Sequence, residues 1–311
     1  MMQNTTIALG VDIGGGHIAC SAIDTTSGRP IPNTTSTSKV DSKGSSQQIL
    51  KCWADCINTT LEKIDKSQLK GIGFAIPGPF NYQKGVAIYE LTDKYESLYN
   101  IAIEPAIMPL LNLDETKIRF LNDASAFAVG AAWCGKAWGT KKSISLTLGT
   151  GFGSAFIDND LPVIKRSDVP DQGCLWYLTF KDGIADDYFS TRWFIREYKK
   201  LTGETVKGVK EIAEIARNHS QANNIFLEFA DNLASFLMPW LKKFEPEVLV
   251  MGGNIMKAAD LFLPALKGLI NCDVQVDIEI SELMEEAAMI GSARLLDDDY
   301  WHKIKPHLPI I

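Results

Sequence analysis

Two alternating apolar runs, each interrupted by glycines, are the clearest pattern in this chain. They cover residues 7–23 and residues 144–157. Because apolar positions alternate both before and after the glycines, each run predicts a β-hairpin rather than a strand that leads into a helix. Glycines at such a turn let backbone N–H groups approach a bulky anion closely. Two facing loops of this kind would enclose a polyphosphate from both sides, so the pattern predicts a nucleotide site.

The remaining apolar positions predict further helices and strands, and the same order of elements occurs twice. Helical spacing is found at 49–64, 104–113, 124–138, 185–201, 210–218, 223–244, 255–268 and 285–296, and strand-like runs at 69–76, 117–121, 248–251 and 274–280. A strand, a hairpin, a helix and a strand recur in both halves. We therefore predict a duplicated α/β fold with a boundary near Leu121 and Asn122.

Composition narrows the function classes. The chain has 311 residues, 46% of them hydrophobic, with a formal net charge of −7, which allows a large core and argues against nucleic acid as the main partner. No apolar run is long enough to cross a membrane, and residues 1–6 are too short and uncharged for a secretory signal. The six scattered cysteines are typical of free thiols in a reducing compartment. These features predict a cytoplasmic protein without a membrane or nucleic-acid partner.

The two glycine loops carry the candidate phosphate-binding residues. In the first loop, Asp12 precedes Gly14, Gly15 and Gly16. A carboxylate beside phosphates is unfavourable unless a cation intervenes, so Asp12 is predicted to bind Mg²⁺ through water. The alternative is a turn aspartate that accepts backbone N–H bonds.

The second loop contains Gly149, Thr150, Gly151 and Gly153, with the threonine hydroxyl as an additional donor. A dinucleotide-binding turn would need a helix directly after the glycines, and here a strand follows. A glycine-containing hairpin without a ligand remains the alternative.

Two further strand ends carry candidate residues. Gly252, Gly253 and Asn254 follow an apolar strand, where bare backbone could contact an adenine or a ribose. The alternative is glycine used for packing. Asn122 and Asp123 lie between a strand and a helix. Asp123 could cap the helix, or it could act as a general base on a substrate hydroxyl while Asn122 binds the substrate.

Together these motifs resemble the actin-like sugar kinase superfamily, and specifically its ROK family. The resemblance covers nearly the whole chain and rests on residues 9–15, 77–79, 122–124, 148–153, 251–254 and 291–294. It implies two ribonuclease-H-like α/β domains with a cleft between them, ATP and Mg²⁺ at the loops, and a hexose in the cleft. The domains would be 1–121, completed by 290–311, and 122–289.

The resemblance also implies roles for individual residues. Asp123 would be the catalytic base, Asn122 a ligand for the sugar hydroxyls, and Pro77 and Gly78 part of the sugar-side loop. Because homodimers are common in the family, it also implies a homodimer.

The chain departs from the family pattern at several positions. The first loop usually reads D-x-G-G-T-K, whereas this chain has Gly16 and His17, and so loses a hydroxyl and a lysine. Many members carry an E-x-G-H stretch and then a cysteine-rich zinc knuckle. Here Asp171 and Asp186 would replace two sugar-binding glutamates and Cys174 a histidine, and no cysteine knuckle follows. We therefore expect no zinc. The shorter carboxylates predict that glucose fits loosely or that another sugar is preferred.

The favoured hypothesis from the sequence is an ATP-dependent kinase that phosphorylates a hexose, at the 6-hydroxyl of glucose or a related sugar. One alternative is a catalytically weak, sugar-binding relative similar to NagC-like transcriptional regulators. Another is a polyphosphate-dependent glucokinase, although an acidic chain offers no evident basic track for a long polyanion. A chaperone-type or exopolyphosphatase-like ATPase would need no sugar, and no long peptide-binding domain is present.

Overall fold

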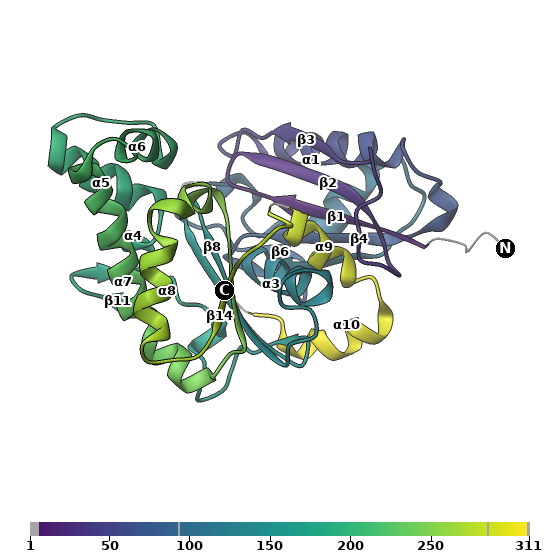
Figure 1. Cartoon of the computed structure of the whole chain (residues 1–311). Coiled ribbons are helices and arrows are strands. Elements are labelled where there is room, and N and C mark those ends of the chain that lie inside the picture. The colour runs from purple at the N-terminus through teal and green to yellow at the C-terminus, as the bar shows by residue number, and fades with distance from the viewer. Residues whose placement is uncertain (1–5, 93, 285, 310–311) are drawn as a thin grey trace.

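Two five-stranded sheets carry the fold in the computed structural model, which describes residues 6–92, 94–284 and 286–309 (Figure 1). The first sheet has the strand order β3–β2–β1–β4–β7, and the second has the order β10–β9–β8–β13–β14. The first sheet contains β1 Ile7–Ile13, β2 His17–Asp24, β3 Ser36–Lys39, β4 Leu69–Ile76 and β7 Ile118–Asn122. The second contains β8 Lys142–Leu148, β9 Phe152–Asp158, β10 Leu161–Pro162, β13 Val248–Gly252 and β14 Asp277–Ile280.

The two sheets share one topology. In each, an antiparallel hairpin (β1–β2 or β8–β9) is extended on one side by two parallel strands and on the other by a short antiparallel strand. The glycine loops connect the two strands of each hairpin. The predicted duplicated α/β fold and both predicted hairpins are therefore confirmed.

The α-helices lie on the faces of the sheets and at their ends. They are α1 Ser46–Leu61, α2 Ile103–Ile107, α3 Asp123–Cys134, α4 Ala185–Tyr188, α5 Thr191–Thr202, α6 Val209–Ala216, α7 Ser220–Phe244, α8 Leu263–Asn271, α9 Glu286–Arg294 and α10 Asp298–Ile304. The small sheets β5–β6 (Phe80–Asn81 and Val86–Ala87) and β11–β12 (Thr179–Phe180 and Gly183–Ile184) complete the two lobes. No helix in these described ranges is long and apolar enough to span a membrane.

Helices α3 and α9 pack against each other between the two sheets (Figure 1). Helix α3 contacts β8 and β9 of the second sheet, and α9 contacts β1 and β4 of the first. Small residues permit this approach: a methyl group added at Gly291 of α9 would lie 1.8 Å from the Ala126 carbonyl oxygen of α3. On the other side of α9, side chains at Gly10 and Gly73 would collide with its backbone. Helix α9, from the C-terminal part of the chain, thus covers the N-terminal sheet. The exact domain division stays a prediction.

Helix α1 illustrates how the apolar period positions an element. Its apolar face packs on β2 and β3, and Ile49, Trp53 and Ile57 are among its fully buried residues. The helix begins with a capping box in which Ser45 and Gln48 each bond the other's backbone N–H. Sequence periodicity and the cap therefore agree on where this helix begins.

Three predicted helices are interrupted. The helix predicted at 104–113 is the short α2 followed by a 3-10 turn at Met108–Leu110. The helix predicted at 185–201 divides into α4 and α5, because the N–H and hydroxyl of Thr191 both donate to the Gly149 carbonyl, at 2.8 and 2.9 Å. The helix predicted at 255–268 is a 3-10 helix, η5 (Asn254–Leu261), followed by α8. Pro264 lies in the first turn of α8, where its missing N–H is tolerated, but it could not continue an earlier helix.

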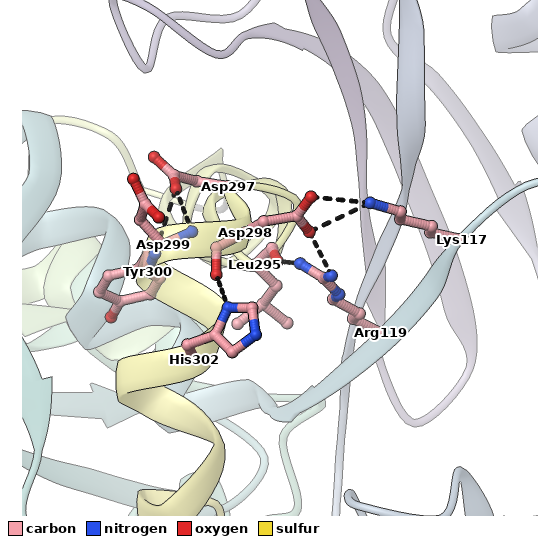
Figure 2. A network of polar contacts seen from close by, with 8 residues as sticks. All are labelled: Lys117, Arg119, Leu295, Asp297, Asp298, Asp299, Tyr300 and His302. Carbon is pink, nitrogen blue, oxygen red and sulfur yellow. Dashed lines mark hydrogen bonds and ion pairs between the residues drawn. The ribbon is translucent and has the colours of Figure 1, made fainter.

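A polar network fastens α10 to β7, the strand that leads into Asn122 (Figure 2). The Asp298 carboxylate accepts from Lys117 at 2.8 Å and pairs with Arg119. Arg119 also donates to the Leu295 carbonyl and lies over the Trp301 ring, 4.7 Å from its centre. Hydrogen bonds from the two basic side chains lower the pKa of Asp298 to about 2.

Candidate active site

Residues from four separate motifs surround one cavity between the sheets. The cavity has a volume of about 170 Å³ and is lined by Asp12, Ile13, Gly14, Asp123, Ala124, Phe127, Thr147, Gly253, Asn254, Met284 and Ala288. Asp12 and Gly14 belong to the first hairpin, Asp123 begins α3, and Thr147 lies near the end of β8. The turn after β13 supplies two more of the predicted residues, Gly253 and Asn254. The structure therefore brings the first loop, the candidate base and the candidate adenosine motif together.

The first loop presents backbone donors. The Gly14 N–H bonds to the His17 carbonyl at 2.9 Å, whereas the N–H groups of Gly15 and Gly16 have no acceptor in the part of the chain that the structure describes. The His17 ring folds back over Gly14, because a methyl group there would lie 2.2 Å from its Cε1 atom. Tyr95 donates its hydroxyl to the Gly14 carbonyl at 2.6 Å. This loop is fixed in shape and retains two free donors, as an anion site requires.

The second loop has a similar arrangement. The Gly149 N–H bonds to the Gly151 carbonyl at 3.0 Å, and the N–H groups of Thr150 and Gly151 have no acceptor among the described residues. Asp186 accepts from the N–H of Phe152 at 2.7 Å and pairs with Arg192 through its other oxygen. Asp186 therefore fastens the second loop in this structure.

Asn122 and Asp123 occupy the junction of β7 and α3. The helix cap is Asn122, whose side-chain oxygen accepts from the Ser125 N–H at 3.1 Å. The alternative that Asp123 caps the helix is therefore wrong, since Asp123 is the first helical residue. One Asp123 oxygen, Oδ1, accepts from Ala124 N–H at 2.8 Å and from the Asn122 amide at 3.0 Å. No hydrogen bond from another described residue to the second oxygen, Oδ2, is found.

The surroundings of Asp123 are poorly solvated. Burial raises the pKa of its carboxyl group above the usual range, although the hydrogen bonds from Ala124 and Asn122 oppose this shift. Tyr82 and Tyr89 lie close enough that burial first, and the Asp123 charge second, raise the pKa of both phenols well above their usual range. Burial also raises the pKa of Cys174 to about 12, with smaller contributions from Asp123 and Asp171. A carboxylate in such surroundings is a stronger base than one in water.

Other predicted residues of the phosphate and adenosine motifs have packing roles. A side chain at Gly153 would collide with Thr147 and Ala124, and one at Gly252 with the Phe127 ring. Gly253 has a positive φ of 92° and lies against the Leu148 carbonyl, so that position requires glycine.

Asn254 connects the central cavity to a second one. This second cavity, about 520 Å³ in volume, lies between α6 and η5. It is lined by Thr191, Gly208, Val209, Lys210, Ala213, Glu214, Arg217, Asn254, Ile255, Lys257 and Ala258. The Lys257 ammonium bonds to the Asn254 side-chain oxygen at 2.6 Å, which orients that side chain at the boundary between the two spaces.

The predicted sugar-side residues lie outside the lining of the central cavity. The Pro77 carbonyl accepts from the Tyr89 hydroxyl at 2.8 Å, and Gly78 is exposed beside it. Asp171 is exposed, and its carbonyl accepts from the Tyr177 hydroxyl at 3.3 Å. Their roles as sugar ligands stay predictions.

The donor set permits magnesium at one position. Asp12 is half-buried and lines the cavity together with Gly14 of the first loop and Asp123. Mg²⁺ is commonly bound by one or two carboxylates together with substrate phosphates and water, which fits a single aspartate beside a phosphate loop. Among the described residues, no three His, Cys, Asp or Glu side chains form a metal-binding group.

The two sheets of matching topology and the cavity between them define the two-lobed α/β fold of the actin-like ATPases. Residues 8–299 match the ROK family, and the chain belongs to it.

Relatives include both enzymes and regulators. The glucokinase of Thermotoga maritima is 23% identical, over 93% of this chain and 97% of that protein. The structure of a ROK family glucokinase from Streptomyces griseus, in complex with glucose and AMPPNP, has a TM-score of 0.75 at 21% identity and covers 93% of this chain and 98% of that one. A ROK family transcriptional regulator, a homologue of the E. coli MLC protein, has a TM-score of 0.77 at 15% identity, with 95% and 79% covered.

Several residues near the site carried no recognisable sequence signal. Tyr82, Tyr89 and Tyr95 lie in a segment of mixed aromatic and charged residues without a period, and only the fold brings them to Asp123 and the first loop. Thr191 and Arg192 could have been suspected from their position at a helix start, but their partners are 42 and 6 residues away. Long-range contacts of this kind have no fixed spacing.

Proposed function

We propose that this protein is an ATP-dependent carbohydrate kinase that phosphorylates a hexose hydroxyl, with Asp123 as the general base. One observation carries the proposal: Asp123 lines the same cavity as Asp12 and Gly14 of the first loop and Asn254 of the adenosine motif. A phosphoryl donor at the loops would therefore place its outermost phosphate near this carboxylate.

The hydrogen bonds of Asp123 support its role as the base. Its Oδ1 atom is fixed by Ala124 and Asn122, which orients the carboxylate, while Oδ2 accepts no hydrogen bond from any other described residue. Burial raises the pKa of this carboxyl group, which increases its affinity for a proton. An oriented carboxylate with one available oxygen suits proton transfer from an alcohol.

The reaction then has a simple balance. The sugar hydroxyl gives its proton to Asp123 Oδ2, and its oxygen forms a bond to the γ-phosphorus. The bond between that phosphorus and the β–γ bridging oxygen breaks, and ADP leaves with the electron pair. The free N–H groups of Gly15, Gly16, Thr150 and Gly151 would orient the phosphates on both sides. The 6-hydroxyl of glucose or of a related hexose is the acceptor that we propose.

The shape of the site favours ATP over inorganic polyphosphate as the donor. The cavity of about 520 Å³ begins at Asn254, at the edge of the central cavity, and runs between α6 and η5. A nucleoside attached to a triphosphate would use this space, whereas a linear polyphosphate would not. Of the basic side chains that line this cavity, Arg217 is already paired with Asp260. A continuous row of unpaired basic side chains, which a long polyphosphate would need, is therefore not evident.

Magnesium would be bound at Asp12 and would neutralise charge on the phosphates. On the acceptor side, Pro77, Gly78, Asn122, Asp171 and Asp186 are proposed to contact the sugar. Because the Asp186 oxygens are used by Phe152 and Arg192, a sugar hydroxyl would have to share or replace one of these contacts. No zinc is expected in this arrangement.

A panel of hexoses and N-acetylhexosamines tests the proposal. Each sugar is incubated with Mg·ATP or with polyphosphate, and ADP release or sugar phosphate is measured. We expect ADP release with at least one hexose, and less phosphorylation with polyphosphate. ATP consumption without any sugar requirement, or no turnover with any sugar, would contradict the proposed kinase.

A sugar-binding regulator without turnover is the second candidate. The engagement of Asp186 by Arg192, together with Gly16 and His17 in the first loop, favours it over a fully efficient enzyme. This candidate predicts that a sugar raises the melting temperature of the protein while no ADP is released. The same sugar panel, read by thermal shift, separates the two functions.

A further inference from the structure

The Lys94 side chain lies across Gly15 of the first phosphate loop. A methyl group added at Gly15 would be 2.6 Å from the Lys94 ammonium nitrogen, 3.2 Å from Cε and 3.3 Å from Cδ. The end of the lysine side chain therefore occupies the space that any larger residue at position 15 would need. The two unpaired N–H groups of this loop, on Gly15 and Gly16, lie at the same turn.

The neighbouring backbone fixes this placement. Tyr95, the next residue, donates its N–H to the Ser42 carbonyl at 2.7 Å and its hydroxyl to the Gly14 carbonyl at 2.6 Å. Its buried ring packs against Trp53, with ring centres 5.6 Å apart. On the other side, the Thr92 hydroxyl donates to the Lys94 carbonyl at 2.8 Å. Lys94 thus projects from a segment that is bonded to the loop itself.

Among the residues that the structure describes, none neutralises the charge of Lys94. No carboxylate in the described part of the chain forms an ion pair with its ammonium group, and the side chain is exposed. Charged surface lysines are common, but this one lies against Gly15 of a loop in which two backbone N–H groups have no acceptor among the described residues. A cation and convergent N–H groups together attract phosphate oxygens.

We propose that Lys94 binds the terminal phosphates of the nucleotide at the first loop, and so replaces from a distant segment the lysine that the loop sequence Gly14-Gly15-Gly16-His17 lacks. This inference rests on the proposed function, because it assumes a nucleotide at the loops. Lys94 belongs to the segment that follows Pro77 and Gly78, on the proposed sugar side. The nucleotide would therefore contact residues of both the first hairpin and the segment that contains Lys94.

Direct binding measurements test the inference. Binding of Mg·ATP and of adenosine is measured by calorimetry for the wild type and for Lys94→Met, Lys94→Arg and Lys84→Met. Lys84 is the matched control, an exposed lysine on the same segment that is not near the loop in any observed contact. Loss of a charge-assisted hydrogen bond predicts Mg·ATP binding about 10- to 100-fold weaker in Lys94→Met.

The other measurements distinguish a phosphate contact from a structural role. Adenosine binding should be unchanged in Lys94→Met, Lys94→Arg should retain most of the Mg·ATP affinity, and Lys84→Met should match the wild type. The weaker binding of Lys94→Met should also depend less on salt. Unchanged Mg·ATP binding in Lys94→Met, or an equal loss of adenosine binding, would overturn the inference, as would a wild type that binds no Mg·ATP.

The outcomes also separate this inference from the proposed function. If Mg·ATP binding depends on Lys94 but no sugar is phosphorylated, the kinase proposal fails and the Lys94 contact stands. If sugars are phosphorylated and Lys94→Met binds Mg·ATP normally, only the Lys94 inference fails.

Discussion

Replacing Asp123 with asparagine separates the chemistry of the site from its folding. Asparagine keeps an oxygen that can accept from Ala124 N–H and from the Asn122 amide, so the start of α3 should remain intact. What disappears is the free carboxylate oxygen. General base catalysis contributes about 10²- to 10⁴-fold to a rate, which corresponds to roughly 3–5 kcal/mol of activation free energy. We expect kcat to fall by that factor while the KM for sugar changes little.

The same variant should be more stable than the wild type at neutral pH. Burial raises the folded-state pKa of Asp123 above its ordinary value of 3.8, so the folded protein holds this proton more strongly than the unfolded chain does. Wild-type stability therefore decreases as the pH rises from 3.8 through the raised pKa, and stays reduced above it. The asparagine variant has no such loss. Its advantage in unfolding free energy should be present at pH 7 and shrink toward pH 4.

The assays are sugar-dependent ADP release and urea denaturation at pH 7 and pH 4. Asp231→Asn, on an exposed position of α7, is the control for replacing an aspartate elsewhere. Near-normal turnover in Asp123→Asn would refute the base assignment. A variant that is less stable than the wild type at pH 7 would refute the account of the buried carboxylate.

Variants at three further positions test other contacts. Gly291→Ala should lower the unfolding free energy by about 1–3 kcal/mol in urea denaturation, because its methyl group would lie 1.8 Å from a backbone oxygen of α3; unaltered stability would show that the two helices separate easily. Asp298→Asn should cost only about 0.2–1 kcal/mol at pH 7, because the Asp298 side chain is 53% exposed and solvent screens its ion pairs. Its difference from the wild type should vanish as the pH falls from 3.8 to about 2, since the lowered pKa stabilises the fold only above that range; a difference that persists at pH 2 would point to another cause. Asp186→Ala should weaken Mg·ATP binding about 10-fold by leaving the Phe152 N–H without its acceptor, whereas Asp186→Asn should retain the affinity; equal effects of the two would mean that the negative charge matters instead.

The sequence was most informative where the structure depends on local rules. Alternation with a period of two, interrupted by glycine, can form only a few structures, so both hairpins and the repeated order of elements could be predicted. The capping box before α1 adds a second local signal that agrees with the first. The first glycine loop also pointed to the cavity, because its chemistry is largely that of the backbone, whereas Gly149, Thr150, Gly151 and Gly153 of the second loop lie outside the cavity lining.

The sequence-based predictions fail where contacts between residues far apart in the chain determine the local structure. The break between α4 and α5 depends on Thr191 and its bonds to Gly149, and no local pattern around residue 190 encodes that partner. Asn122 and Asp123 are both good capping residues, and the length of β7 decides between them. Whether Asp186 contacts a sugar or a loop is equally a matter of tertiary geometry, as is the position of Lys94 over Gly15.

The coverage of β1 and β4 by α9 has a consequence for the order in which the protein folds during synthesis. Gly10 and Gly73 lie against backbone atoms of Met289 and Ser292, so one face of the N-terminal sheet is completed by residues that are synthesised long after the sheet itself. Until then, that face remains open to solvent or to other chains. Synthesis of α9, rather than emergence of the first lobe, is therefore the step after which this face can be covered.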